Sequence, residues 1–199
     1  MNIPRRRFLQ LAAGAAALPA ATRSAFADTY PSRPVHLVAG FAACSKSDSG
    51  GDDKGGTPST GTIGEINDSS EAGSIAFVKE QSYASWETRQ PTAIKSNSAH
   101  GGFTRTYFNE TAAAAARAGT VPLPKGSVIV KELFDESGTT LTGHAFMAKS
   151  TEGAAGETWL WFEGFKEAYA NPYYGMGHKT CTGCHSAGKD FVQTAVPQP

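Results

Sequence analysis

Residues 126–133 have the sequence Gly-Ser-Val-Ile-Val-Lys-Glu-Leu, and this stretch predicts the fold. Its β-branched residues favour an extended strand, in which successive side chains point to opposite faces of a sheet. Lys131 therefore shares a face with Ile129 and Leu133. An ammonium group is costly to bury. This lysine is thus either an edge residue that snorkels to water or an amine that loses its proton and becomes a nucleophile.

Three further strands are predicted around this one, which itself is expected over 127–134. Residues 103–108 are aromatic and β-branched, and 141–149 and 158–165 have the same character. The intervals between the later strands contain Ser-Gly and glycine-rich turns, and short connections favour antiparallel neighbours. The sequence therefore predicts a mainly antiparallel sheet.

Two short helices are predicted beside the sheet. Asn109 can cap a helix that continues through the alanines at 112–116 and ends at Gly119. The apolar residues between 75 and 86 are compatible with a second helix. The expected fold class is therefore α+β, an antiparallel sheet with a few short helices.

Residues 181–185, Cys-Thr-Gly-Cys-His, contain the Cys-x-x-Cys-His signature of c-type haem attachment. Cysteines three apart lie about one helical turn from each other, so both sulfurs can reach the vinyl groups of one porphyrin. Cys181 and Cys184 are therefore candidates for attaching a single haem c, and His185 for binding its iron. The alternatives are a redox dithiol, which is typical of the start of a βαβ unit, and half a zinc site, which needs a second ligand pair.

The first 27 residues predict an export signal. Three arginines at 5–7 precede an alanine-rich apolar segment at 11–21, and Ala25-Phe26-Ala27 has the small-x-small pattern of a cleavage site. A basic amphipathic helix is the alternative. Export agrees with the haem motif, because c-type haem is attached outside the bacterial cytoplasm, so a periplasmic location is expected. The export route stays open.

Residues 28–70 are expected to lie outside the folded domain. Together with the signal, residues 29–43 resemble the start of the solute receptors of tripartite tricarboxylate transporters, as a natural fusion or a misplaced start. The receptor's remaining residues are absent, so no solute binding is implied. Residues 45–70 are rich in Gly, Ser, Thr and Asp, which favours a disordered linker. The folded domain is predicted to span 71–199.

Cys44 follows Phe41-Ala42-Ala43, which resembles the lipobox of lipoproteins. The flexible segment after it is typical of a lipoprotein tether, so a lipid anchor at Cys44 is one interpretation and a free, exposed thiol is the other.

Composition limits the class of partner. Lys+Arg 18 and Asp+Glu 18 give a net charge of zero, so nothing indicates a nucleic-acid partner. No apolar run is long and uninterrupted enough to predict a membrane span.

The order of motifs over about residues 75–196 resembles the cytochrome P-460 family and its relatives, the cytochromes c-prime-beta. The motifs are Ala99-His100-Gly101, Tyr107-Phe108-Asn109, Gly126 to Leu133, Phe146-Met147-Ala148-Lys149, Trp159-Leu160-Trp161, Cys181 to His185 and Asp190-Phe191-Val192. The resemblance implies one haem held against an antiparallel sheet, a five-coordinate iron with His185 as proximal ligand, and often a homodimer. In cytochromes P-460 the lysine of the central strand is joined covalently to the porphyrin, which makes Lys131 a further candidate for binding the cofactor.

One departure from the family concerns catalysis. Members that oxidise hydroxylamine carry a carboxylate on the strand after the lysine strand, and alignment places Ala145 there. Alanine cannot accept a proton. His144 and Glu132 are predicted to face the opposite side of the sheet. An apolar pocket over the iron is therefore expected, bounded by Phe103, Met147 or another aromatic residue.

Two function classes remain open. The first is a haem protein that binds small diatomic ligands such as nitric oxide, or passes single electrons to a partner. The second is an oxidoreductase that acts on hydroxylamine or a related nitrogen compound with a lysine-crosslinked haem. A non-haem interaction module on a lipoprotein tether is a third interpretation. His100 and His178 are interpreted as loop residues, with a second axial ligand as the alternative.

Overall fold

The structure is a computed structural model that describes residues 61–166 and 169–198. The predicted export signal, the receptor-like segment and Cys44 lie outside the described residues. The family resemblance, by contrast, falls almost entirely within them.

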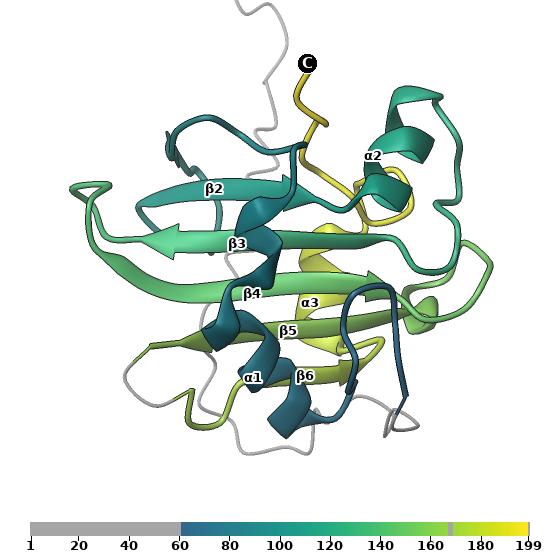
Figure 1. The fold of residues 1–199 in the computed structure, drawn as a ribbon, viewed down its shortest axis with the longest axis horizontal. Coiled ribbons are helices and arrows are strands. Elements are labelled where there is room, and N and C mark those ends of the chain that lie inside the picture. The colour runs from purple at the N-terminus through teal and green to yellow at the C-terminus, as the bar shows by residue number, and fades with distance from the viewer. Residues whose placement is uncertain (1–60, 167–168, 199) are drawn as a thin grey trace, which may run out of the picture. The chain divides into compact units, whose positions relative to one another are not determined.

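Six antiparallel strands form one sheet in the described part of the chain, and their order in the sheet is their order in the sequence (Figure 1). The strands are β1 (Ile94–Lys95), β2 (Phe103–Phe108), β3 (Val128–Phe134), β4 (Leu141–Lys149), β5 (Trp159–Phe165) and β6 (Tyr173–Met176). The four predicted strands correspond to β2–β5 within one residue at each end, so the predicted antiparallel sheet is confirmed.

The two edge strands were not predicted. β1 has only two residues, and both are exposed. β6 begins after Pro172 and contains Gly175 with a φ of 138°, a backbone conformation that favours glycine. Strands this short and irregular lack an alternating apolar pattern that could predict them.

The helices are α1 (Glu71–Glu80), α2 (Glu110–Arg117) and α3 (Lys179–His185), with short 3₁₀ turns η1 (Ser82–Ser85) and η2 (Gly156–Thr158). Asn109 caps α2 as predicted, since its Oδ1 accepts a hydrogen bond from the backbone N–H of Ala112 at 2.9 Å. α1 begins earlier than the predicted helix because Ser70 caps it through the N–H of Gly73. None of the helices in the described residues is long and apolar enough to cross a membrane.

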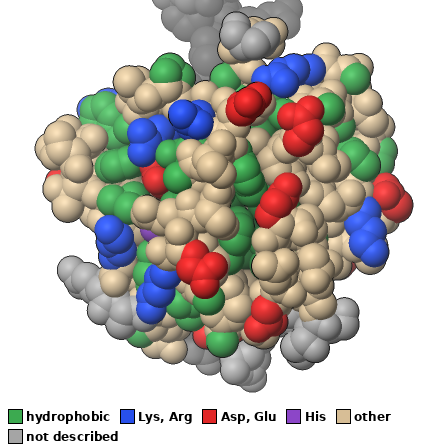
Figure 2. Space-filling model, in the orientation of Figure 1, with side chains coloured by type: hydrophobic (Ala, Val, Ile, Leu, Met, Phe, Trp, Pro, Cys, Tyr) green, Lys and Arg blue, Asp and Glu red, His purple; other side chains and the backbone are tan. Residues whose placement is uncertain are grey.

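The sheet separates two cores. α1 lies against one face, and α3, which ends in the haem motif, lies behind the other (Figure 1). The core of the α1 face includes Phe77, Val78, Tyr83, Val130 and Phe146. The core of the α3 face includes Phe108, Ile129, Met147, Trp159 and Trp161, with Cys181 packed against them. On the exterior of the α1 face, acidic and basic side chains are interspersed (Figure 2).

The folded domain begins earlier than predicted. Ile63 and Ile66 form an antiparallel bridge, and both are buried in the core of the α1 face, with Ile66 fully inaccessible. The buried Asn109 side chain donates a hydrogen bond to Glu65 at 2.7 Å and another to the carbonyl of Gly126 at 2.8 Å. The predicted start at Glu71 is therefore too late by about ten residues. The low apolar content of this segment predicted a linker. The segment nevertheless contains two isoleucines, and these pack its turn against the core.

Candidate functional site

A row of side chains crosses the α3 face of the sheet. Lys131 of β3 lies opposite Ala145 of β4, and Ala145 lies opposite Glu163 of β5. Directly opposed residues of antiparallel strands share a face, so the three side chains point to the same side. Ala145 contributes only a methyl group between the lysine and the carboxylate.

His185 ends α3 beside this row, and its hydrogen bonding leaves one ring nitrogen open. The Nδ1 atom lies 2.8 Å from the backbone carbonyl oxygen of Phe191. Because a carbonyl can only accept, Nδ1 carries the hydrogen, and Nε2 of the neutral ring keeps its lone pair. Burial lowers the pKa of His185 to about 4, which keeps the imidazole neutral. The ring is held edge-on against Trp161, with 4.9 Å between the ring centroids. This is the state in which histidine binds a metal.

Lys131 is largely buried on the same face. Burial lowers the pKa of its ammonium group, while the carboxylate of Glu163 acts in the opposite direction. The predicted orientation of Lys131, on the face of Ile129, is confirmed by the strand register. A lysine with a depressed pKa is a better nucleophile than a solvated one.

Cys181 packs against the apolar core of the α3 face, and its Sγ lies 3.8 Å from Nδ1 of His178. Burial raises the pKa of the Cys181 thiol to about 12. A redox dithiol needs a thiol that ionises readily near neutral pH, so this environment does not favour the dithiol interpretation. Cys184 lies one helical turn further along α3, is partly buried, and is disulfide-bonded in this structure. Haem attachment at Cys184 therefore requires that disulfide to be reduced first.

The α3 face is more polar than the sequence predicted. Nδ1 of His100, in the loop before β2, lies 3.1 Å from Oε1 of Glu163, and both side chains are about 15% exposed or less. The rings of His100 and His185 are 5.9 Å apart between centroids. Polar side chains therefore lie beside His185, on the face where the sequence predicted an apolar pocket over the iron.

Two of the residues expected to bound that pocket differ in position. Met147 is buried on the α3 face, as expected. Phe103 is next to Thr104, which lies opposite Leu133 on the α3 face, so Phe103 itself points to the other side of the sheet. Glu163 could have been found from the alternation of 159–165, since it lies two residues after Trp161. His100 carries no comparable signal, because its loop follows no period.

The other charged candidates face away from His185, as predicted. Glu132 accepts hydrogen bonds from the hydroxyls of Tyr83 and Tyr107 and forms an ion pair with Arg105 at 2.7 Å. His144 lies 2.6 Å from the hydroxyl of Tyr169. Both residues belong to a buried polar group within the α1 face.

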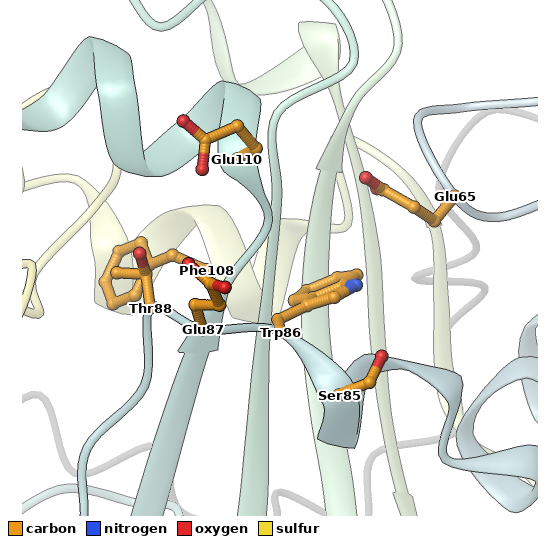
Figure 3. A pocket seen from close by; sticks show the side chains of 7 residues that line it. All are labelled: Glu65, Ser85, Trp86, Glu87, Thr88, Phe108 and Glu110. Carbon is orange, nitrogen blue, oxygen red and sulfur yellow. The ribbon is translucent and has the colours of Figure 1, made fainter.

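A separate cavity of about 220 Å³ lies between η1 and the start of α2 (Figure 3). Its walls include three glutamates and Trp86, and the lining residues are Glu65, Ser85, Trp86, Glu87, Thr88, Phe108 and Glu110. None of these residues belongs to the row that faces His185, so the cavity is distinct from the candidate haem site.

The antiparallel sheet and the donor set on its α3 face have the features of a haem protein. A neutral histidine with an open Nε2, two cysteines in one helical turn and a small alanine opposite a half-buried lysine fit this cofactor. The chain belongs to the cytochrome P460 family, because the family description Cytochrome P460 matches residues 80–194. No curated protein matches the chain. The family implies a haem cofactor and suggests a c-type haem protein, in agreement with the resemblance seen in the sequence.

Proposed function

We propose that this chain is an exported mono-haem c-type cytochrome that binds small ligands such as nitric oxide, or transfers single electrons, at a five-coordinate iron. Cys181 and Cys184 hold the haem through thioether bonds, and His185 is the proximal ligand. The observation that carries the proposal is the hydrogen bond from Nδ1 of His185 to Phe191, since it presents Nε2 as the ligand atom. Haem supplies the open iron position for a ligand and the reversible one-electron chemistry.

The remaining parts of this proposal concern the chain's surroundings. A periplasmic location follows from the signal-like first 27 residues and from the site of haem attachment in bacteria. A lipid anchor at Cys44, a homodimer and an electron-transfer partner accompany it as the family resemblance and the sequence suggest.

Covalent attachment is tested with protein made beside a c-type maturation system. Wild-type protein should keep its haem through acid-acetone extraction and give the pyridine haemochrome spectrum of haem c. The variant C181A/C184A should lose its haem during extraction, because no thioether remains. Haem that stays covalently bound in this variant would show that the attachment is not through these cysteines.

A second candidate function is the oxidation of hydroxylamine or a related nitrogen compound with a lysine-crosslinked haem. The burial of Lys131 beside His185 and Glu163 favours it, because a neutral amine on this face can bond to the porphyrin edge. Glu163 also favours it, because its carboxylate lies opposite Ala145 on the neighbouring strand. Ala145 aligns with the proton acceptor of hydroxylamine-oxidising members of the family.

The crosslink is tested by the mass of the denatured protein. The new N–C bond replaces one N–H and one C–H bond, and an external two-electron oxidant such as a peroxide must take up the two electrons as two protons leave. A crosslinked wild type should therefore be lighter than apoprotein plus haem by two hydrogens, and its absorption spectrum should differ from that of ordinary haem c. Lys131→Ala should restore both the mass and the spectrum of an uncrosslinked haem c protein. A wild type with the full summed mass and an ordinary spectrum would exclude the crosslink.

A further inference from the structure

The segment that follows the haem motif is held by a buried ion pair whose two residues are 41 positions apart in sequence. Nζ of Lys149, the last residue of β4, lies 2.8 and 2.9 Å from the two carboxylate oxygens of Asp190. Both side chains are completely inaccessible to solvent. Because the pair is fully buried, removing one partner leaves an unpaired charge in the core, which is strongly unfavourable.

Asp190 has two more donors on its carboxylate. The indole N–H of Trp159, the first residue of β5, donates to Oδ1 at 3.3 Å, and the backbone N–H of Leu123 donates to Oδ2 at 2.9 Å. The carboxylate therefore joins the ends of β4 and β5 and the loop after α2 to the C-terminal segment. Four hydrogen bonds from three donor groups leave it little freedom to rotate.

This anchoring coincides with an unusual backbone. Asp190 and Phe191 have φ values of 48° and 67°, in the left-handed region that non-glycine residues rarely adopt. Such conformations persist where the surrounding structure determines them. The consequence at Phe191 is that its carbonyl oxygen faces Nδ1 of His185, while its ring lies edge-on to Trp161 at 6.3 Å between centroids.

We propose that the Lys149–Asp190 ion pair is a positioning device for the proximal histidine. It holds the Phe191 carbonyl against Nδ1 of His185 and so adjusts the electron donation of that imidazole to the iron. This inference rests on the proposed function, in which His185 binds the haem iron. A hydrogen bond to the outer nitrogen of a ligating histidine fixes its orientation and raises its basicity, and loss of such a partner commonly changes metal affinity ~10–100-fold.

The test is Asp190→Asn in the haem-loaded protein. The amide keeps the shape of the carboxylate but loses the charge that Lys149 requires, so the 190–191 backbone should relax. A weaker bond at Nδ1 makes the imidazole a poorer donor, which favours ferrous iron. We expect a lower iron–histidine stretching frequency in the resonance Raman spectrum of the ferrous protein and a more positive reduction potential. The expected change in the ferric–ferrous equilibrium is on the order of tenfold, about 59 mV for one electron.

Glu132→Gln is the matched control, because Glu132 is also a buried, ion-paired carboxylate but lies on the α1 face. It should lower the melting temperature while leaving the stretching frequency and the potential at their wild-type values. Equal shifts in both variants would reveal a general effect of destabilisation and would overturn the proposal.

If Asp190→Asn does not fold, the variant K149M/D190L replaces the pair with apolar side chains, an exchange that buried ion pairs often tolerate. A folded double variant with an unchanged stretching frequency and potential would overturn the proposal, and shifts in the stated directions would support it. The pyridine haemochrome spectrum distinguishes failure of the proposed function from failure of the positioning role. Absence of haem c in the wild type refutes the proposed function, whereas haem c with unshifted variants refutes only the positioning role.

Discussion

At the scale of single residues, the site combines the predicted pair of Lys131 and Ala145 with two ionisable residues that were not predicted there. Lys131 and Ala145 occupy the face and register that strand periodicity predicts. Glu163 and His100 add a carboxylate and an imidazole to the same face, close to His185. Ionisable groups therefore lie on the same face as Ala145, with Glu163 directly opposite it on the neighbouring strand.

Replacing Ala145 tests whether the missing acceptor limits catalysis. Ala145→Glu should raise the rate of hydroxylamine oxidation, since a positioned general base commonly contributes about 10²–10⁴-fold. Turnover is measured with an excess of an artificial one-electron acceptor. Ala145→Gln is the control, because it has nearly the same shape and cannot accept the proton. Fast turnover by the wild type would instead indicate that Glu163 or His100 already serves this purpose.

The residues predicted correctly are those within regular strands. Period-two alternation placed Lys131 on one face and Glu132 and His144 on the other, because successive side chains of a strand point to opposite faces of the sheet. The contact between His100 and Glu163 spans 63 positions of sequence and joins a loop to a strand. No local pattern encodes such a contact, so it could be found only from the folded chain.

At the scale of elements, the turn over residues 61–70 shows how little sequence a packed segment needs. Only Ile63 and Ile66 are apolar in this segment, and both insert into the core of the α1 face. Composition averaged over the window predicted disorder, whereas two correctly spaced side chains are sufficient for burial.

Truncating one of these isoleucines measures the contribution of the turn. Ile66→Ala should lower the free energy of unfolding by about 2–5 kcal/mol, because it leaves a cavity in a fully buried position. Ile94→Ala is the matched control at a side chain that is 50% exposed, and it should change stability by less than about 0.5 kcal/mol. Both are measured by urea denaturation. If Ile66→Ala lowers the free energy of unfolding as little as Ile94→Ala does, the turn does not contribute to the folded unit.

At the scale of the whole described unit, each face of the sheet has its own group of ionisable side chains. The α3 face has His185 and Lys131, and the α1 face has the polar group around Glu132 and His144. His144 is 1% exposed, and its Nε2 has no hydrogen-bond partner among the described residues. Burial lowers its pKa from 6.5 to about 4, with Glu132 opposing this change and Lys166 adding to it.

The stability of the unit should therefore depend on pH. The unfolded chain binds a proton at His144 near pH 6.5, whereas the folded chain does so only near pH 4. Stability should thus be complete above about pH 6.5 and fall as the pH approaches 4, by about 3 kcal/mol for this residue.

Urea unfolding of the wild type and of His144→Leu between pH 7 and 4 measures this effect. The carboxylates titrate in both proteins, so the difference between the two curves isolates the histidine. A difference that stays constant over this range would contradict the assignment.

The order of the strands also has a consequence for assembly. Each strand pairs with its neighbour in the sequence, so the sheet can grow in the direction of synthesis, one hairpin after another. The haem motif follows β6, and it emerges only after every strand has been made. If the exported chain folds in this order after it reaches the periplasm, the sheet offers a surface for docking porphyrin while Cys181 and Cys184, the proposed attachment residues, are still exposed. Cofactor capture and the final folding step would then coincide in time.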